Sequence, residues 1–403
     1  MMDKLDTLFD KFVSHSLFKN KLVLQSQYTP DSITHRDSQI EAVAGILAPS
    51  LRGERTSNLF IYGKTGTGKT LSVQHVGNKI VDRLKAAGQD HVRFVYVNCK
   101  LKKVADTEYR ILAEIIHELG GSVPATGLPT DQVYARFIDL IDQKKQNIIL
   151  VLDEIDEAVK KMSDSFIYSL TRLNASLKHA QISIIGISNS LTFMDDLDPR
   201  VKSSLGEEDL VFPPYNALQL QDILRERSEQ AFKDAVVDEG VLPHCAALAA
   251  REHGDARRAL DLLRVAAELA EREQAHKVTS QHLLAANDKI ERDKVLDTVE
   301  SVPRQYQAVL GAIMHLDAKQ EEEGIFTGDV YNHYQTVCET NKLETLTQRR
   351  VSDILAEFDM LGIINTQVIS KGRQGRTREI KLMLAPPIKL KVLDILGTSL
   401  TLS

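Results

Sequence analysis

The stretch Gly63-Lys64-Thr65-Gly66-Thr67-Gly68-Lys69-Thr70 decides the fold of this chain. It fits the pattern G-x-x-x-x-G-K-[ST], and it directly follows the short apolar run 59–62. Glycines in this pattern let backbone N–H groups turn toward phosphate oxygens, and the start of the following helix adds partial positive charge. We therefore predict a loop that binds the phosphates of ATP or ADP. The plainer interpretation is a glycine-rich turn without a ligand.

Two residues of this loop carry specific expectations. Lys69 is expected to reach the β- and γ-phosphates, and the hydroxyl of Thr70 is expected to hold Mg²⁺. The remaining six positions would bind the nucleotide mainly through their backbone; they are Gly63, Lys64, Thr65, Gly66, Thr67 and Gly68.

Further short apolar runs, rich in Val and Ile, follow the loop at 92–97, 148–152 and 182–187. Stretches of helical character separate them. Buried strands that alternate with helices indicate a parallel sheet covered on both faces, so we predict the α/β class.

The run 148–152 ends in Asp153 and Glu154. Ligands of open parallel sheets bind at the carboxyl ends of the strands, which is where these two carboxylates are expected. Asp153 would hold Mg²⁺ through water, and Glu154 would orient and activate the attacking water. On its own, a strand that ends in two acids is weak support for a site; after a phosphate loop it is strong support. Asp156 is expected to cap a helix.

Two polar side chains farther along the chain fit the same pocket. The run 182–187 is followed by Ser188-Asn189-Ser190, so Asn189 could contact the γ-phosphate or the attacking water; an ordinary turn asparagine is the alternative. At Gly254-Asp255-Ala256-Arg257, Gly254 or Asp255 would cap a helix. Arg257 would then lie in the first turn, where the helix dipole does not favour a cation. Contact with phosphate would explain it, although a solvated arginine near Asp255 is possible.

The chain divides into three expected parts. Pro213-Pro214 ends the α/β pattern, and the chain beyond it is helical; the expected helices are 217–231, 243–252, 256–270 and 280–292. A third part begins near Pro303. We predict a nucleotide-binding base at 1–212, a helical lid at 213–295 and a DNA-binding domain at 300–403.

The bulk composition limits the possible partners. The net charge is −6, from 50 basic and 56 acidic residues, so any nucleic-acid contact must use local basic patches. No stretch reaches the about 18 apolar residues of a membrane span. Residues 1–12 have the pattern of a short amphipathic helix and not of a signal peptide. We expect a cytoplasmic, nucleoid-associated protein, in which Cys99, Cys245 and Cys338 serve only in packing.

The C-terminal part has a candidate recognition helix. Thr347 can cap a helix over 348–361, and one apolar stripe follows it along the sequence: Val351, Ile354, Leu355, Phe358 and Leu361. The opposite face begins with Gln348, Arg349 and Arg350. Polar and basic residues at this position suit a helix that enters the major groove of DNA.

A basic hairpin follows that helix. Residues 370–381 hold five basic residues and one acid, and two glycines lie at the expected tip. The candidates for phosphate contact are Lys371, Arg373, Arg376 and Arg378. A solvated turn is the plainer interpretation. Few of these side chains could read bases, so phosphate contacts and DNA shape are expected to supply much of the affinity.

Together these features resemble the AAA+ superfamily, with Walker A at 63–70, Walker B at 148–154, sensor one at Asn189 and sensor two at Arg257. Within it, the chain is similar to the archaeal replication initiators related to the origin recognition complex and the cell-division-cycle helicase loader. The strings that carry this resemblance are 28–30 with 35–36, 96–99, 109–113, 198–205 and 212–215, and it spans about residues 20–384.

The resemblance implies an AAA+ base with a parallel sheet, an α-helical lid and a C-terminal winged helix. It implies a protein that binds double-stranded origin DNA, is switched by ATP binding and hydrolysis, and helps to recruit the replicative helicase. Other copies of the initiator are further candidate partners. Tyr215 would lie at the nucleotide. The segment 28–36 would lie at the adenine of that nucleotide.

The resemblance also implies a helical insertion near 102–126 that touches DNA, with Lys102, Lys103 and Arg110 as its basic residues. Arg200 matches an arginine that faces a neighbouring copy's nucleotide. Members with two such arginines would carry the second near Ser204, and its absence weakens the case for hydrolysis activated by a neighbour. Ser190 stands where many relatives have an acid.

Two other functions remain open on the sequence alone. One is a nucleotide-regulated transcriptional regulator that binds DNA but does not act in replication. The other is a clamp loader, a class of AAA+ protein that lacks a C-terminal winged helix, so the segment 347–384 argues against it.

Overall fold

The computed structural model describes residues 16–401 apart from 31, 101–106, 125–126, 163–164, 196, 206, 320–323 and 371–375. The chain forms two compact units, Met1–Leu284 and Ala285–Ser403. The helix expected over 1–12 lies outside the described residues. None of the helices in the described part of the chain combines the length and apolarity needed to cross a membrane.

A five-stranded sheet forms the centre of the first unit. Its strands are β1 (Leu59–Tyr62), β2 (Val92–Asn98), β3 (Gln146–Asp153), β4 (Ala180–Ser188) and β5 (Glu208–Val211). They lie in the order β2-β3-β4-β1-β5 and all neighbours run parallel, which confirms the predicted parallel sheet. All eight residues of β3 are buried, as expected for a central strand of a doubly covered sheet. The sequence interpretation missed β5, a short edge strand that begins with two acids.

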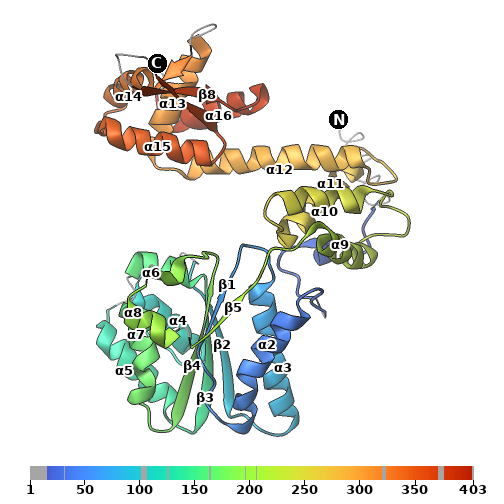
Figure 1. The fold of residues 1–403 in the computed structure, drawn as a ribbon, viewed down its shortest axis with the longest axis vertical. Coiled ribbons are helices and arrows are strands. Elements are labelled where there is room, and N and C mark those ends of the chain that lie inside the picture. The colour runs from blue at the N-terminus through green and yellow to red at the C-terminus, as the bar shows by residue number, and fades with distance from the viewer. Residues whose placement is uncertain are drawn as a thin grey trace, which may run out of the picture. The chain divides into compact units, whose positions relative to one another are not determined.

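Helices cover both faces of this sheet (Figure 1). On one face lie α2 (Asp37–Leu47) and α3 (Lys69–Ala86), and Val43 and Val73 share a core there with Ile61 and Ile149 of the sheet. The other face carries α4 (Glu108–Glu118), α5 (Thr130–Ile141), α6 (Ile155–Met162), α7 (Ser165–Arg172) and α8 (Pro199–Leu205). Short 3-10 turns occur at Lys21–Leu24, Ala48–Arg52, Leu173–Ala175 and Phe193–Asp195.

The chain is helical after Pro213-Pro214, where three helices form the expected lid region. Its helices are α9 (Ala217–Ala231), α10 (Val241–Arg251) and α11 (Ala256–Arg272). Asn216 caps α9, because its side chain accepts a hydrogen bond from the backbone N–H of Gln219 while the Gln219 side chain bonds back to the Asn216 N–H. Helix α12 (Ser280–Ser301) runs nine residues past its predicted end at 292. No glycine or proline interrupts the sequence before Pro303, which explains the longer helix.

The second unit is a winged helix, as the sequence predicted. It contains α13 (Arg304–Lys319), α14 (Thr327–Thr340), α15 (Gln348–Met360) and α16 (Pro386–Ser399). Strands β6 (Ile325–Phe326), β7 (Ile364–Ser370) and β8 (Arg376–Leu382) form an antiparallel sheet in the order β6-β8-β7. The two-residue strand β6 was not predicted, because its length gives no periodic signal.

Helix α15 follows its predicted pattern with one exception. The side chain of Thr347 accepts a hydrogen bond from the backbone N–H of Arg350, which confirms the predicted cap. The first four residues of the predicted apolar stripe are fully buried. Leu361 is 49% exposed, so its place in the stripe was wrong. The helix ends at Met360 and Gly362 turns the chain away with a φ of 70°, so Leu361 is not carried onto the buried face.

Candidate functional site

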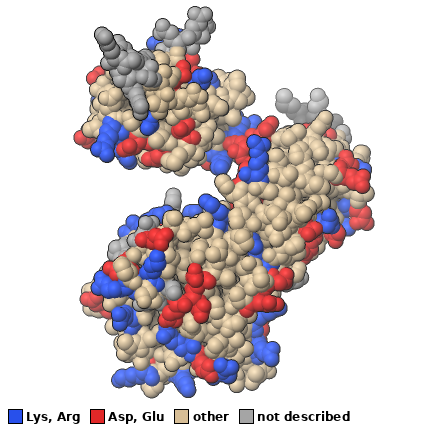
Figure 2. All heavy atoms as spheres, viewed as in Figure 1, with Lys and Arg blue, Asp and Glu red and all other residues tan. Residues whose placement is uncertain are grey.

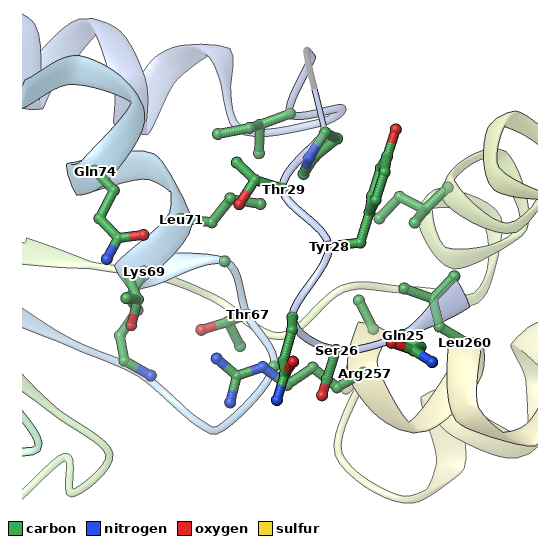
Figure 3. A pocket seen from close by; sticks show the side chains of 18 of the residues that line it. Gln25, Ser26, Tyr28, Thr29, Thr67, Lys69, Leu71, Gln74, Arg257 and Leu260 are labelled. Carbon is green, nitrogen blue, oxygen red and sulfur yellow. The ribbon is translucent and has the colours of Figure 1, made fainter. Parts of the chain in front are cut away.

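Three neighbouring strands bring the predicted pocket residues to one edge of the sheet. Strand β4 lies between β1 and β3, and its register places Ser188 opposite Tyr62 and Ile187 opposite Asp153. The phosphate loop follows β1, Asn189 follows β4, and Asp153 ends β3. A cavity of about 440 Å³ opens at this edge, between the loop, the segment 25–34 and the lid (Figure 3).

The phosphate loop has the backbone that its glycines predict. Gly66 and Gly68 have φ values of 68° and 87°, in the left-handed region that favours glycine. Helix α3 begins at Lys69 without a side-chain cap, so its first N–H groups remain available to an anion. Residues 66–70 line the cavity, whereas Gly63, Lys64 and Thr65 do not. Gly63 instead packs so tightly that an added Cβ would lie 2.4 Å from the carbonyl oxygen of Phe212.

Lys69 lies buried beneath the loop with its ammonium group fully used. Its Nζ donates hydrogen bonds to the carbonyl oxygens of Gly63 (2.7 Å) and Lys64 (2.8 Å) and to Oδ1 of Asn189 (2.9 Å). Burial lowers the pKa of Lys69 to about 8, although Asp153 acts in the opposite direction. The three acceptors hold the ammonium group beneath the loop at the edge of the cavity, where an anion would restore its charge balance.

Asp153 is held by three donors. The hydroxyl groups of Thr70 and Tyr96 each donate to Oδ2 at 2.7 Å, and the backbone N–H of Glu154 donates to Oδ1 at 3.0 Å. A carboxylate beside a threonine hydroxyl is an oxygen donor set that suits a hard divalent cation such as Mg²⁺. Burial and the Asp153 charge raise the pKa of Tyr96 well above its usual range, so its hydroxyl stays a donor.

Glu154 is strained and incompletely bonded. Its φ of 54° lies in the left-handed region, which is costly for a residue with a side chain and is found most often at functional sites. Its Oε2 is buried without a hydrogen-bond partner, and the ammonium group of Lys100 lies 3.5 Å away. A buried carboxylate oxygen that lacks a hydrogen bond fits a position that faces water or a ligand.

Asp156 differs from its predicted role. It is the second residue of α6 and not its cap, and it is buried. Its Oδ1 accepts a hydrogen bond from the hydroxyl of Ser188 at 2.8 Å, so it fastens α6 to the end of β4. This contact lies beside Asn189 and holds the strand end that carries it.

The lid contributes Arg257 to the cavity. Asp255 caps α11 by accepting hydrogen bonds from the backbone N–H groups of Arg257 (2.8 Å) and Arg258 (3.2 Å), which confirms one of the two predicted caps. Arg257 extends from this first turn into the cavity and lowers the pKa of Lys69, so the two cations share the same space (Figure 3). Tyr215 also lines the cavity.

The far end of the cavity is formed by residues for which no individual role was predicted. The guanidinium carbon of Arg227 lies 4.8 Å from the centroid of the Tyr28 ring. Glu226 accepts hydrogen bonds from the hydroxyls of Ser32 (2.8 Å) and Thr34 (2.7 Å) and so ties the segment 28–36 to α9. The flat ring of Tyr28, together with Leu71 and Leu260, suits a planar heterocycle.

Arg200 does not join this cavity. It is exposed on α8, where its guanidinium donates two hydrogen bonds of 3.0 Å to the carboxylate of Asp198. Its guanidinium carbon also lies 5.3 Å from the ring centroid of Tyr168. An exposed arginine held in this way remains compatible with the expectation that it faces another copy of the chain.

The candidate DNA contacts of the second unit lie at the start of α15 and on the β7–β8 hairpin, where Arg378 is half-buried. Gln348, Arg349 and Arg350 begin α15 and all three are open to solvent; Arg350 lies 3.8 Å from Asp353. In the β7–β8 hairpin, Arg376 pairs with Ser370 and Arg378 with Val368. Lys371 and Arg373 lie outside the described residues, as do Lys102 and Lys103 of the predicted insertion. In the face shown in Figure 2, basic and acidic side chains are interspersed.

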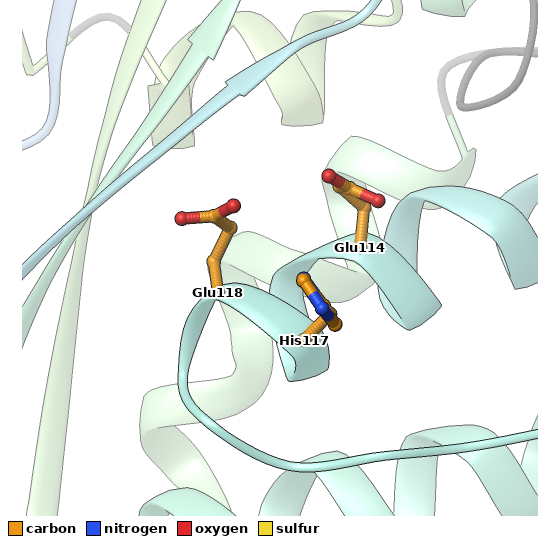
Figure 4. Close-up of side chains that lie close together, drawn as sticks. All are labelled: Glu114, His117 and Glu118. Atoms are coloured by element: carbon orange, nitrogen blue, oxygen red, sulfur yellow. The ribbon is translucent and has the colours of Figure 1, made fainter.

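The predicted insertion contains α4, whose first turn carries the exposed Arg110. The last turns of this helix bring ligand atoms of Glu114, His117 and Glu118 within 4.8 Å of one another (Figure 4). All three side chains project from one helix, and two of them are exposed. A group of this kind is common on protein surfaces without a metal, so we assign it no function.

Known proteins resemble the chain along almost its whole length. Three family models match: AAA domain over 52–194, Cdc6 AAA+ ATPase-type lid domain over 221–288, and CDC6, C terminal winged helix domain over 297–390. The "ORC1-type DNA replication protein" of Pyrococcus furiosus is 54% identical and covers 94% of this chain and 90% of its own length. The "ORC1-type DNA replication protein 1" of Methanosarcina mazei is 49% identical, with coverages of 96% and 93%.

Solved structures give the same result. The structure of the Aeropyrum pernix ORC1 protein in complex with DNA has a TM-score of 0.83 and 44% identity, and covers 94% of this chain and 97% of its own. CDC6P from Pyrobaculum aerophilum has a TM-score of 0.57 at 21% identity, covers 96% of this chain and 100% of its own, and therefore supports the fold alone.

Proposed function

Because the chain belongs to the family of ORC1-type DNA replication proteins, we propose that it is an ATP-dependent initiator that binds double-stranded DNA at a replication origin. One observation carries the proposal. Lys69, Asp153, Asn189 and Arg257 converge on a single cavity in a chain that also has a winged helix. The cavity fits a nucleoside triphosphate, and the winged helix fits DNA.

The cavity residues divide the work of binding a nucleotide. The N–H groups of residues 66–70 and the ammonium of Lys69 would neutralise phosphate oxygens. Thr70 and Asp153 would hold Mg²⁺, which would supply positive charge to the β- and γ-phosphates. The ring of Tyr28 would stack on the adenine. Tyr215 would line the cavity beside Gly68 of the phosphate loop.

Three residues are proposed to act in hydrolysis. Glu154, whose Oε2 is buried without a hydrogen bond, would accept a proton from the attacking water. Asn189 would hold that water or the γ-phosphate, since it is already fastened to Lys69. Arg257 would stabilise charge on the phosphates from the lid, so that the lid position depends on which nucleotide is bound. Arg200 would serve a neighbouring copy.

The second unit is proposed to bind DNA in two ways. The start of α15, with Gln348, Arg349 and Arg350, would enter the major groove. The β7–β8 hairpin, including Arg376 and Arg378, would contact phosphates, and Arg110 of the first unit would add a third contact. In this account the nucleotide state of the first unit controls whether the protein, bound to origin DNA in the cytoplasm, helps to load the replicative helicase.

Mapping of the protein's binding sites across the genome tests this function. Strong sites at a replication origin, protected from nuclease digestion by the purified protein, are the expected result. Sites confined to promoters would overturn it and support the transcriptional regulator instead. Repeating the protection assay with ATP, with ADP and without nucleotide tests the switch, because an initiator's footprint should change with the nucleotide.

A further inference from the structure

Arg36 is the largest charged side chain that the first unit buries completely. It precedes α2 and is 2% exposed. Its Nε donates a hydrogen bond to the carbonyl oxygen of Thr67 at 2.8 Å, and its Nη2 donates to the carbonyl oxygen of Pro213 at 2.6 Å. The guanidinium carbon lies 3.8 Å from the centroid of the Tyr215 ring and 5.7 Å from that of Phe212.

A buried cation of this kind is costly unless its surroundings compensate it. Within the part of the chain that the structure describes, no carboxylate forms an ion pair with Arg36. Its charge is met by two backbone carbonyls and two aromatic faces, and the Tyr215 side chain also interacts with it electrostatically. Such an arrangement costs stability without an obvious structural return, because an apolar side chain could fill the same space.

The partners of Arg36 belong to two segments that are joined by hydrogen bonds. Thr67 lies in the phosphate loop, and Pro213 and Tyr215 lie in the connection between β5 and the lid. That connection continues into the lid through a hydrogen bond from the N–H of Tyr215 to the carbonyl oxygen of Gly254 (3.2 Å). The lid is also bonded directly to the phosphate loop, because the N–H of Ala256 donates to the carbonyl oxygen of Gly66 at 3.2 Å.

The packing around these bonds leaves little room for independent movement. A Cβ added to Gly68 would lie 3.0 Å from the hydroxyl oxygen of Tyr215, and one added to Gly254 would lie 2.3 Å from the Tyr215 carbonyl oxygen. Arg36 therefore joins the loop that cradles phosphate to the segment that positions the first turn of α11. The next residue after Ala256 is Arg257, which reaches into the cavity.

We propose that Arg36 is a positioning residue that fastens the phosphate loop to the lid connection and thereby fixes Arg257 over the bound phosphates. Arg36 does not line the cavity, so it acts on the nucleotide only through these neighbours. Its planar guanidinium can donate in two directions at once and stack on a ring, which a lysine cannot do. The inference rests on the proposed nucleotide binding.

A double-mutant cycle on the full-length protein tests this link. The Kd for a non-hydrolysable ATP analogue is measured by calorimetry for the wild type, Arg36→Met, Arg257→Ala and the double variant. Each single change is expected to weaken binding by about tenfold, and the double change by no more than the larger single effect, because Arg257 is already misplaced without Arg36. Effects that multiply would overturn the proposal.

Two further variants guard against a general loss of folding. Arg36→Lys keeps the charge but reaches only one of the two carbonyls, so it should also lose coupling to Arg257; wild-type affinity in this variant would contradict the proposal. Arg264→Met is the matched control, because Arg264 lies on the same helix as Arg257 but pairs with Asp261 and Glu268 outside the cavity. It should destabilise the lid without changing the effect of Arg257→Ala.

The wild-type titration separates the two possible failures. If the wild type does not bind the analogue, nucleotide binding itself fails. If the wild type binds and the effects of Arg36→Met and Arg257→Ala multiply, only the role of Arg36 fails.

Discussion

The polar side chains of the cavity in the first unit and those on the exposed start of α15 in the second are held in opposite ways. Lys69 and Asp153 each have three hydrogen-bond partners within the protein before any ligand arrives. Arg349 and Arg350 are exposed, and the guanidinium of Arg350 lies 3.8 Å from the carboxylate of Asp353. The difference matches the ligands: a nucleotide has one shape to be matched, whereas a DNA backbone presents repeated charge that flexible arginines can follow.

The largest expected effect is on nucleotide affinity, when the constrained ammonium group of Lys69 is removed. Lys69→Ala removes the ammonium group beneath the loop, so ATP and ADP binding should weaken by at least about 100-fold, as each lost charge-assisted contact in a buried site is worth about 1.5–3 kcal/mol. Calorimetric titration measures the change. Lys79→Ala, an exposed lysine on the same helix, should bind normally. Unchanged affinity in the Lys69 variant would remove the loop from the account.

Glu154→Gln should separate binding from hydrolysis. The amide keeps the shape of the side chain but cannot accept a proton from water, so the hydrolysis rate should fall by about 100-fold or more while ATP affinity stays within about threefold. Release of radiolabelled phosphate measures the rate. The control is Glu157→Gln, an acid on α6 that pairs with Lys160. Equal rates in the Glu154 variant and the wild type would show that another group activates the water.

A smaller effect is expected from the exposed arginines. Arg349→Ala combined with Arg350→Ala should weaken DNA binding by about tenfold or more and reduce the slope of log K against log salt by about one for each lost phosphate contact. Fluorescence anisotropy with duplex DNA at several salt concentrations measures both quantities. Lys79→Ala with Lys85→Ala removes the same charge from α3 and controls for net charge. An unaltered slope would take α15 out of the interface.

The smallest expected effect is on the pH dependence of stability, and it comes from a pair of stacked histidines in the second unit. The rings of His315 and His333 stack with centroids 4.0 Å apart, and both Nε2 atoms are buried without hydrogen bonds. Burial lowers the pKa of both rings below the ordinary value of 6.5, and Lys319 adds to the effect, as does His315 for His333. In the unfolded chain both rings would take up protons at a higher pH than in the folded unit.

The sign of the pH effect follows from this difference. As pH falls through about 6.5, the unfolded chain gains protons that the folded unit resists, so stability is lost. His333→Gln should reduce the fall in Tm between about pH 7.5 and 5.5 by a few degrees, as thermal unfolding would show. His179→Gln, an exposed histidine of the first unit, should change nothing. If Tm fell as much in the His333 variant as in the wild type, His333 would not be a cause of the pH dependence.

The sequence was sufficient to predict those features that depend on a local pattern of residues. The glycine spacing predicted the loop, and the Val- and Ile-rich runs predicted four of the five parallel strands. Thr347 was recognised as a cap, and Asp255 as one of two candidate caps, from their positions before helices. These features depend on neighbours within a few residues, which a sequence displays directly.

Features that depend on distant neighbours could not be predicted. Tyr96 and Arg36 lie in strings that marked the resemblance, but their partners Asp153 and Pro213 are far along the chain. The side chain of Tyr96 could be assigned to Asp153 only if β2 and β3 were known to be adjacent. Asp156 was mistaken for a cap for the same reason, because its bond to Ser188 joins two elements.

The edge strand β5 has a consequence for how the sheet of the first unit meets other proteins. It pairs with β1 on one side only, and its first two residues, Glu208 and Asp209, are exposed acids. An open strand edge invites the same edge of another molecule to extend the sheet. Here the two exposed carboxylates, on a strand of only four residues, make that edge a poor template, because an added strand would lie beside negative charge that nothing on β5 compensates.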